Sequence, residues 1–514
     1  MRNLLKIALL TGVIGFTACE SNLEFSDYNK LPQEEFWQTK EDAISALTAC
    51  YGQFNADWAY YDNSVMGPEE MAGDNTAKGS TAGSQSEVNA FIDYSFTPSF
   101  TRFDNLWKSR YAMVNLCNQV LEYVPDIEMD EADKKQILGE AKFIRAWTYF
   151  EMAKLWGEVI IYDGLPENGA YDIEKSSIEE VYAFILRDLK YGYENMRKSP
   201  WGSEWKGRVT AWSARALEAK VLMYMASGVN FMPDGQAIGE KTWEDVKTVT
   251  NDVINNGIYS LYTAKGDSSF FYLFRLAQEN CDESIFESQA GVSSTNGGVA
   301  QSAYALNSWV KSFDGGFGYS VPSDDLVAAW KAREAEQNDL RYQYSVIFYG
   351  DTLVDDRVVE GATDIDGVTG LPRYNYKVYI PLAERSDIKG NWWMQQTEQN
   401  QRFFRFADVL LIDAEAKFMT NDVAGAAVSL NKVRSRAGEP EISSGNLTLQ
   451  DIWDERRFEL AFENDRYFDL VRTGQAETVL GSRGWTKPKN VFYPIPQVQI
   501  DLSIGPLKQN AYWE

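Results

Sequence analysis

Amphipathic helical segments follow one another along this chain and constrain its fold more than any other feature. Apolar side chains recur at spacings of three and four residues, which is the period of one face of an α-helix. The pattern predicts helices over residues 40–55, 104–124, 131–156, 177–196, 209–228 and 242–256, and again over 406–419, 422–437 and 449–472. The fold is therefore predicted to be mainly α.

The order of these helices indicates how they pack. Between residues 104 and 256, helix pairs recur about every 35–45 residues, a spacing typical of tetratricopeptide-like pairs that stack into a superhelical scaffold. Ala and Gly on the helix faces allow antiparallel neighbours to approach closely. Because the repeats are degenerate, an irregular helical bundle is the alternative interpretation.

Two long regions interrupt the helices, and both are rich in aromatic residues. Residues 56–103 and 257–400 combine Gly, Ser, Thr and Asn with interspersed Trp, Tyr and Phe. Short strand patterns occur at 284–289, 344–349 and 374–380, and residues 475–514 are predicted to be extended. Since long loops on a scaffold often carry function, we expect the ligand-facing surface in these two regions.

The composition excludes several classes of function. The 514-residue chain has no histidine, which excludes His-based acid–base catalysis, Ser-His-Asp and Cys-His arrangements and His-ligated metal sites. A net charge of −26 disfavours nucleic acid as a ligand and is repelled by anionic lipid, although acidity can also serve solubility alone. The 16 Trp and 28 Tyr residues suit sugar rings, but they equally suit a helical core.

The N-terminus resembles an export signal that ends in a cysteine. A basic start precedes an apolar stretch, residues 7–16, that is too short to cross a bilayer. The following Thr-Ala-Cys resembles a bacterial lipobox, whose cysteine is acylated and becomes the mature N-terminus. We expect a lipoprotein signal peptide over 1–18, lipidation at Cys19 and a tether over 19–35, so that lipid alone attaches the protein to a membrane. The alternative is a simple signal peptide with an incidental cysteine.

Three further cysteines are present, at positions 50, 117 and 281. Their odd number rules out a complete disulfide framework, and a bridge between Cys50 and Cys117 is left open. None of them shows the spacing of metal ligands. No cofactor, metal ion or catalytic residue is expected.

Several motifs carry a resemblance to a known family. The segment Phe404-Arg-Phe-Ala-Asp-Val-Leu-Leu-Ile-Asp-Ala-Glu-Ala is followed by Leu430-Asn-Lys-Val-Arg-Ser-Arg-Ala-Gly and by the charged stretch 454–474. These motifs resemble those of the SusD/RagB family of outer-membrane nutrient-binding lipoproteins. Phe36-Trp37, residues 139–146 and Tyr493-Pro-Ile-Pro extend the resemblance to essentially the whole chain. Asp413 and Asn464 depart from the family pattern.

The resemblance implies a fold and a function. It implies one SusD-like domain over 36–514, with a helical scaffold at about 104–256 and 404–472. It also implies a protein anchored by lipid to the outer membrane, facing the cell exterior, that captures oligosaccharides and delivers them to a TonB-dependent β-barrel transporter. Some relatives carry peptides, so the peptide-binding component of a similar importer is one alternative.

The charged stretch 454–474 raises a further alternative, a hydrolase that uses a carboxylate pair. Its acidic and basic residues alternate at spacings of three and are predicted to pair along one helix face. The predicted pairs are Arg456–Glu459, Glu463–Arg466, Arg466–Asp469 and Asp469–Arg472, with Arg405, Asp408 and Glu415 able to join them. Arginines keep such carboxylates ionised, so we interpret the motif as scaffold rather than site.

The candidate ligand contacts come from the two aromatic loop regions, where no family motif fixes their positions. Their aromatic side chains are predicted to stack on sugar rings: Trp58, Tyr60, Tyr61, Phe100, Tyr304, Trp309, Phe317, Tyr319, Trp392 and Trp393. The predicted partners for sugar hydroxyls are Asp74, Asn75 and Asn296. For any single aromatic residue, packing in the core is the alternative explanation.

Overall fold

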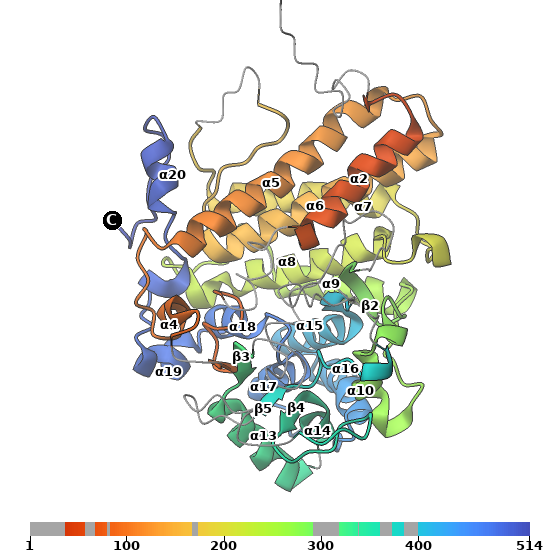
Figure 1. Ribbon diagram of the computed structural model, residues 1–514, viewed down its shortest axis with the longest axis vertical. Coiled ribbons are helices and arrows are strands. Elements are labelled where there is room, and N and C mark those ends of the chain that lie inside the picture. The colour runs from red at the N-terminus through yellow and green to blue at the C-terminus, as the bar shows by residue number, and fades with distance from the viewer. Residues whose placement is uncertain are drawn as a thin grey trace, which may run out of the picture. The chain divides into compact units, whose positions relative to one another are not determined.

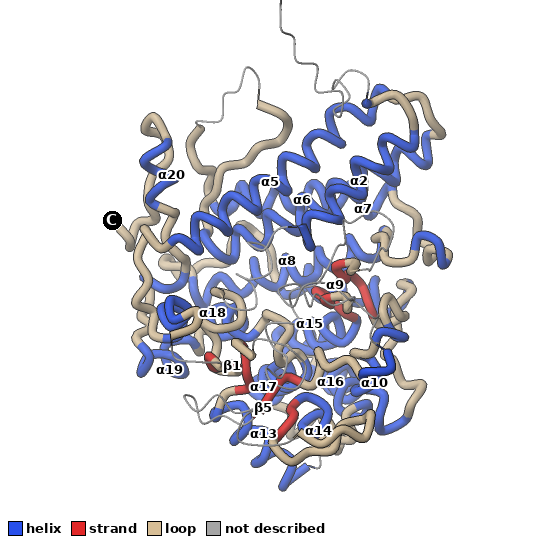
Figure 2. The backbone as a smooth tube through the Cα atoms, viewed as in Figure 1, coloured by secondary structure: helices blue, strands red, loops and turns tan. Residues whose placement is uncertain are grey.

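Helices make up most of the computed structural model, and the strands are few and short where the structure describes the chain (Figure 2). The structure describes residues 36–56, 67–79, 83–166, 173–290, 318–337, 339–359, 373–384 and 399–514. Residues 39–514 form one unit, whereas residues 1–38 belong to another. The predicted signal peptide and Cys19 lie outside the described residues, as does the predicted tether.

Antiparallel helices form a stack in the first half of the chain. Its members are α2 (Lys40–Ala56), α5 (Thr101–Tyr123), α6 (Glu131–Trp156), α7 (Ile178–Asn195), α8 (Ala211–Phe231) and α9 (Trp243–Asn256). From α5 to α9, each helix packs against the next in chain order, and α2 packs against α5 and α6 (Figure 1). The prediction of a mainly α fold with tetratricopeptide-like helix pairs is confirmed.

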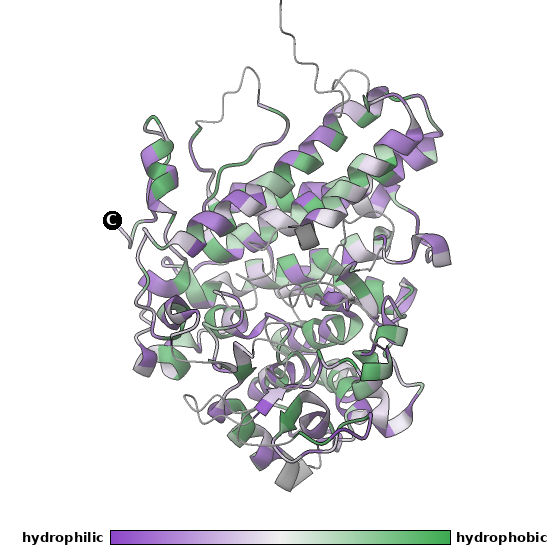
Figure 3. Cartoon of the chain, viewed as in Figure 1, coloured by the Kyte–Doolittle hydropathy of each residue, from purple (hydrophilic) through white to green (hydrophobic). Residues whose placement is uncertain are grey.

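Local signals explain why these helices begin where they do. The Asp130 carboxylate caps α6 by accepting hydrogen bonds from the backbone N–H groups of Ala132 and Asp133. Ser177 and Glu180 form a capping box at the start of α7. Hydrophilic and hydrophobic residues alternate along α2 and α5, as expected of helices with one buried face (Figure 3).

Close packing holds the stack together. A methyl group at Gly192 of α7 would lie 3.2 Å from Cβ of Ala214 on α8, a contact tighter than most. The helices α6 and α8 are buried over most of their length, with Ala, Leu, Val and aromatic side chains inside. The stack therefore has a mainly apolar core, with buried ion pairs such as Arg145–Asp188 inside it.

The second half of the chain packs around one central helix. Its helices are α15 (Phe406–Met419), α16 (Val423–Arg436), α17 (Leu449–Glu459), α18 (Arg466–Arg472), α19 (Ala476–Leu480) and α20 (Gln497–Leu502). Helix α15 is buried along Phe406–Ala416 and packs against α8, α9, α16 and α17 (Figure 1). It therefore connects the stack to the rest of the unit.

The prediction of one helix over 449–472 is wrong. The chain forms α17 and α18 with a turn between them, in which Phe462 and Asn464 have left-handed φ angles of 66° and 65°. Residues from distant segments hold this turn: the backbone N–H of Asn464 donates to Glu70, and Lys377 donates to the backbone O of Ala461. No glycine or proline in this turn predicts from the sequence that the helix ends here. Residues 475–514 are likewise not simply extended, because they include α19 and α20.

Short antiparallel strand pairs join distant loops. The strands are β1 (Thr76–Lys78), β2 (Ser284–Ser288), β3 (Ser320–Pro322), β4 (Val346–Phe348), β5 (Arg373–Asn375) and β6 (Gln401–Arg405), and the pairs are β1–β3, β2–β6 and β4–β5. The predicted strand at 284–289 is confirmed. The one predicted at 344–349 is shorter, since Tyr344 and Ser345 end a helix, and the one at 374–380 stops at Asn375.

The loop regions contain short helices that the sequence did not predict. These are α4 (Asn89–Ile92), α10 (Ser269–Leu273), α13 (Asp324–Gln337) and α14 (Arg341–Ser345). In α13, Leu326 and Trp330 are fully buried and pack against Phe458 of α17. The region 257–400 is therefore partly helical, and α13, α14, β4 and β5 lie at the end of the unit opposite α5 (Figure 1).

Candidate ligand-binding surface

Strands β1 and β3 bring the two predicted loop regions together. Ala77 lies opposite Val321 in the ladder. Beyond the ladder, the backbone N–H of Gly79 donates to the carbonyl of Tyr319 at 2.7 Å, and the Ser323 hydroxyl donates to the carbonyl of Asp74 at 2.6 Å. We call this feature the loop junction and define it as residues 74–79, 83–84 and 318–323. It joins segments that are 249 residues apart in the chain.

The two backbones of the loop junction are in direct contact. A Cβ atom added to Gly79 would lie 2.1 Å from the carbonyl oxygen of Gly318. No residue with a side chain fits there without moving the backbone, so Gly79 permits this close approach. The position of one loop therefore fixes that of the other.

Tyr319, a predicted ligand contact from the second aromatic cluster, lies at the loop junction. Its hydroxyl is 3.0 Å from that of Ser84, and its side chain is partly exposed. The remaining members of the predicted aromatic set lie outside the described residues: Trp58, Tyr60, Tyr61, Tyr304, Trp309, Phe317, Trp392 and Trp393. The predicted polar contact Asn296 also lies outside them.

Phe100 precedes α5 and is half-buried. Its ring centroid is 5.3 Å from that of Phe91 and 5.6 Å from that of Phe103, so it takes part in an aromatic cluster. Nearby, Arg102 donates hydrogen bonds to Gln85 and Glu87. The start of α5 is thus tied to the segment that follows Ser84.

Asp74 and Asn75 are buried beneath the loop junction, where arginines hold them. The Asp74 carboxylate accepts from Arg466 Nε at 2.6 Å and pairs with Arg457 at 2.9 Å. Burial would raise the pKa of Asp74, but the two arginines outweigh it and lower that pKa. The Oδ1 of Asn75 accepts from Arg457, while its buried Nδ2 makes no hydrogen bond within the described part of the chain. Through these arginines, Asp74 and Asn75 connect the loop junction to α17 and α18.

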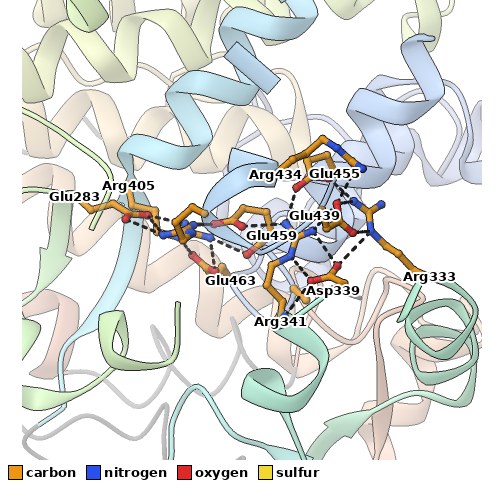
Figure 4. Close-up of polar contacts among 12 residues, drawn as sticks. Glu283, Arg333, Asp339, Arg341, Arg405, Arg434, Glu439, Glu455, Glu459 and Glu463 are labelled. Atoms are coloured by element: carbon orange, nitrogen blue, oxygen red, sulfur yellow. Dashed lines mark hydrogen bonds and ion pairs between the residues drawn. The ribbon is translucent and has the colours of Figure 1, made fainter. Parts of the chain in front are cut away.

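A buried network of ion pairs, which we call the ion-pair core, lies among α15, α17 and the 333–341 segment (Figure 4). Its members are Glu283, Arg333, Asp339, Arg341, Lys377, Arg405, Arg434, Arg436, Glu439, Glu455, Glu459 and Glu463. The carboxylate of Glu459 forms ion pairs with three arginines: with Arg341 at 3.0 Å, with Arg405 and with Arg436.

The ion-pair core corrects the predicted pairing within the charged motif. Of the four predicted spacings, Asp469–Arg472 forms an ion pair, at 2.7 Å. Arg456 pairs with Asp408 and Asp469, and Glu463 pairs with Arg405 and Lys377, so the partners come mostly from other elements. Arg405 belongs to the ion-pair core, and Asp408 and Glu415 pair outside it with Arg456 and Arg472 of the charged motif, so the prediction that all three join such pairs is confirmed.

Most carboxyl groups of these networks are held ionised. Burial would raise the pKa of Glu459, but Arg436, Arg405 and Arg341 outweigh it and hold that pKa well below its usual range. Several buried carboxyls behave differently: burial raises the pKa of Glu70 to about 8, that of Glu439, together with Glu455, to about 7, and that of Asp465 as well. The Glu70 and Glu439 side chains are each about 4% exposed and Asp465 is 6% exposed, so none of them is open to a ligand.

A hollow of about 530 Å³ opens beside β4 and β5, and we call it the tyrosine hollow. It lies between α10, α14, β4 and the hairpin that follows. Its lining residues are Ser268, Phe271, Tyr272, Tyr342, Gln343, Tyr344, Val346, Phe348, Asp351, Thr352, Leu353, Val354 and Tyr376. The sequence placed these residues in a ligand-facing region but did not single them out, since they alternate with apolar residues like ordinary core. The cluster of tyrosines between 342 and 376 was the available signal.

A second hollow of about 480 Å³ lies between α5, the loop after Val159 and α20. Trp107, Tyr111 and Tyr162 line it together with Leu502 and Leu507, so its wall is mainly apolar. The Tyr111 hydroxyl donates to the carbonyl of Ile160 and is therefore occupied.

Neither a metal centre nor a membrane span is found in the described part of the chain. No three or more acidic or cysteine side chains are grouped to hold a metal ion there. No helix within those ranges is both long and apolar enough to cross a bilayer. The thiols of Cys50 and Cys117 are free and buried.

Comparison with known proteins relates this architecture to one family. Residues 264–513 match the model of the SusD family, and residues 22–223 match a model described as starch-binding associating with outer membrane. A SusD-like protein of Bacteroides ovatus is 26% identical over 502 residues, which cover 92% of this chain and 83% of that protein. SusD-like protein P38 of Formosa agariphila is 25% identical over 95% of this chain and 94% of its own length.

Solved structures share the fold. A laminarin-binding SusD-like protein superposes with a TM-score of 0.75 at 22% identity, covering 92% of this chain and 99% of that one. Surface glycan-binding protein A from Bacteroides thetaiotaomicron, solved in complex with laminarihexaose, gives 0.73 at 22% identity over 92% of this chain and 100% of that one.

Proposed function

The chain belongs to the SusD/RagB family, and from this premise we propose that it captures glycans at the cell surface without converting them. It then delivers them to a TonB-dependent β-barrel transporter of the outer membrane. The names of relatives support this proposal: one family model refers to starch binding at the outer membrane, and two similar structures are of glycan-binding proteins.

The loop junction is the observation that carries the proposal. It brings the two aromatic loop regions to one place on a rigid base, because β1 pairs with β3 and Arg457 and Arg466 hold Asp74 beneath them. An aromatic ring that is mobile before binding loses conformational freedom when it stacks on a sugar, and this loss weakens binding. Aromatic stacking therefore needs such a base. Tyr319 belongs to this surface, and we propose that Trp58 and Trp309 contribute the main stacking faces.

The carboxyl groups support binding without catalysis. A glycosidase needs one carboxyl that can donate a proton and a second that is ionised, both within reach of the sugar. Glu70 and Glu439 have raised pKa values, yet both are buried, and Glu459 is locked to three arginines. A hydrolase using a carboxylate pair is therefore the weaker alternative.

Glycan binding can be tested by calorimetry with the mature protein and a panel of neutral hexasaccharides, including laminarihexaose and maltohexaose. The double variant Trp58→Ala, Trp309→Ala is expected to bind at least tenfold more weakly, since two stacking faces are lost. Trp205→Ala is the matched control, because Trp205 is 37% exposed and lies away from the loop junction.

The outcomes separate the alternatives. A folded double variant that binds as tightly as the parent would contradict the assignment of the site. Binding of basic peptides in place of every glycan would favour the peptide-importer alternative. Release of reducing sugar from a bound glycan would establish a hydrolase.

The proposed anchor and partner need separate tests. We expect the protein to reach the outer membrane through lipid on Cys19, and Cys19→Ser is expected to move it from the membrane to the soluble fraction. Co-purification with a β-barrel transporter from detergent-solubilised membranes tests the partner. A Cys19→Ser protein that stays in the membrane fraction after a high-salt wash would show that lipid is not its anchor.

A further inference from the structure

The tyrosine hollow combines aromatic rings with a polar rim. Tyr272, Tyr342, Tyr344 and Phe348 are all partly exposed within it, from α10, α14 and β4. In a core these rings would be covered, and so many half-exposed aromatic side chains around one hollow are unusual for a plain surface. The hollow therefore offers ring faces to a ligand.

Several polar groups in the hollow are unused. Gln343 and Thr352 are exposed, and neither side chain makes a hydrogen bond to another described residue. The Tyr272 hydroxyl also has no hydrogen-bond partner among the described residues, although its ring contacts Phe271. Other groups are already occupied: the Tyr376 hydroxyl accepts from the backbone N–H of Val354 at 3.0 Å. The unused side chains can form hydrogen bonds with the hydroxyl groups that project from the edge of a sugar ring stacked in the hollow.

The charge of the hollow favours a neutral ligand. No Lys or Arg is among its lining residues, and Asp351 is its acidic member. Three described cations lie over rings that line the hollow. Arg275 lies 4.3 Å from the centroid of Phe271 and 5.7 Å from that of Tyr376, and Lys265 and Lys331 lie 5.3 Å from the centroid of Tyr272 and 5.8 Å from that of Phe348. Within the lining itself an anionic sugar would meet the carboxylate of Asp351, whereas the hydroxyls of a neutral sugar can donate to it.

The hollow shares no lining residue with the loop junction. A buried cluster that includes Phe271, Ile347, Leu353 and Tyr374 lies behind it, and Val321 of the loop junction belongs to the same cluster. The loop junction thus contacts one side of this cluster through Val321, while the tyrosine hollow opens from another. Two ligand surfaces can therefore share one base without sharing a contact residue.

We infer that the tyrosine hollow is a second glycan-binding site, which takes a neutral pyranose unit between Tyr272 and Tyr344 and bonds its hydroxyls through Gln343 and Thr352. Its volume of about 530 Å³ is within the range of small-molecule sites and can hold one or two sugar rings. The sugar class rests on the proposed function, whereas the location of the site rests on the geometry of the hollow.

The site can be mapped by hydrogen–deuterium exchange of the mature protein with the neutral hexasaccharides named above. We expect a hexasaccharide to slow exchange in the peptides covering 268–273 and 341–354. This protection is expected to persist in the Trp58→Ala, Trp309→Ala variant, because that variant leaves the hollow intact. Tyr272→Ala, Gln343→Ala is expected to abolish it and to weaken binding at this site by about tenfold.

Tyr349→Ala is the matched control, because Tyr349 is 49% exposed and next to the hollow without lining it. It is expected to leave the protection unchanged. Tyr272→Ala, Gln343→Ala should remain folded, with a melting temperature slightly below that of the parent, because Tyr272 is half-buried against Phe271 and Gln343 is exposed.

The outcomes distinguish this inference from the proposed function. If hexasaccharides bind and protect the loop junction but leave exchange in the hollow unchanged, the hollow is not a glycan site and the proposed function stands. If protection in the hollow is lost in the Trp58→Ala, Trp309→Ala variant, it is not an independent site. If an oligogalacturonate hexamer protects the hollow and neutral hexasaccharides do not, the inferred ligand class is wrong. If no glycan binds anywhere, both proposals fail.

Discussion

The helical stack and the ion-pair core are both buried, but apolar side chains dominate the stack whereas charged side chains form the ion-pair core. The stack from α5 to α9 packs mainly apolar side chains, whose contacts have no direction, with a few buried ion pairs such as Arg145–Asp188 among them. The ion-pair core places charged groups such as Arg341 and Glu459 at zero exposure, where each must meet an oppositely charged partner in a fixed geometry.

This difference explains where the family resemblance is strongest. An apolar core tolerates many exchanges of similar volume, so helix repeats become degenerate in sequence while keeping their shape. A buried charge without its partner is costly, so the residues of such a network change together or not at all. The long motifs at 404–416 and 454–474 contribute Arg405, Glu455, Glu459 and Glu463 to the ion-pair core, whereas the stack contributes the shorter motif 139–146 and otherwise periodicity.

The largest predicted effect comes from breaking the ion-pair core while keeping its shape. Glu459→Gln leaves Arg341, Arg405 and Arg436 without the charge that they share. We expect it to lower the free energy of unfolding by about 3–5 kcal/mol, measured by urea denaturation at pH 7. A loss below 1 kcal/mol would mean that the network tolerates an unpaired charge and would remove the contrast with the stack.

A smaller effect is expected from Glu70, because its pKa is raised rather than lowered. Its carboxyl accepts one hydrogen bond from Asn464, and Lys377, Glu69 and Asp465 are the charged groups nearest to it. A folded-state pKa of about 8 means that its contribution to stability is complete below the unfolded pKa of 4.5 and is lost as pH rises to about 8.

Glu70→Gln removes this titration while keeping an acceptor for Asn464. We expect the variant to be more stable than the parent at pH 9, by on the order of 2 kcal/mol, and nearly equal to it at pH 5. Thermal unfolding of both proteins at the two pH values measures the difference. Equal melting temperatures at pH 9 would show that Glu70 does not carry an unfavourable charge.

In the helical stack, a matched conservative change should cost little. Leu217 of α8 is fully buried, and Leu217→Met keeps its volume. We expect a loss below about 1.5 kcal/mol by urea denaturation, since Met adapts to irregular packing. A loss of stability as large as that of Glu459→Gln would show that the helical stack and the ion-pair core are equally sensitive to conservative substitution.

The smallest effect concerns the end of a helix in the stack. Asp130→Ala removes the acceptor for two N–H groups at the start of α6. We expect a loss of about 1 kcal/mol, and Asp130→Ser, which keeps a capping oxygen, should recover most of it. If serine and alanine behave alike, the cap does not contribute to stability.

The sequence predicted the parts of the fold that depend on local signals. Helix α6 was predicted over its full range because its periodicity is long, and in the structure Asp130 caps its start. The break between α17 and α18 was missed, since the left-handed Phe462 and Asn464 are held by Glu70 and Lys377 from distant segments. Tertiary contacts decide such positions, and they leave no trace in the neighbouring residues.

The proposed ligand-binding surface lies in regions that the sequence indicated, but the contacts within it could not be predicted. The sequence indicated both aromatic loop regions, and Tyr319 lies where they meet. It could not indicate the pairing of β1 with β3, because three-residue strands have no distinctive pattern. Asp74 was interpreted as a partner for sugar hydroxyls, whereas Arg457 and Arg466 already hold it.

The loop junction depends on contacts between segments that are far apart in the sequence, and this separation affects the order in which parts of the molecule can fold. Asp74 is made early, but its partner Arg466 follows 392 residues later. Contacts so distant in sequence form late in folding, because the chain must close a large loop before they stabilise it. A newly made chain can therefore pair β1 with β3 before Arg457 and Arg466 are available to hold Asp74 at the loop junction.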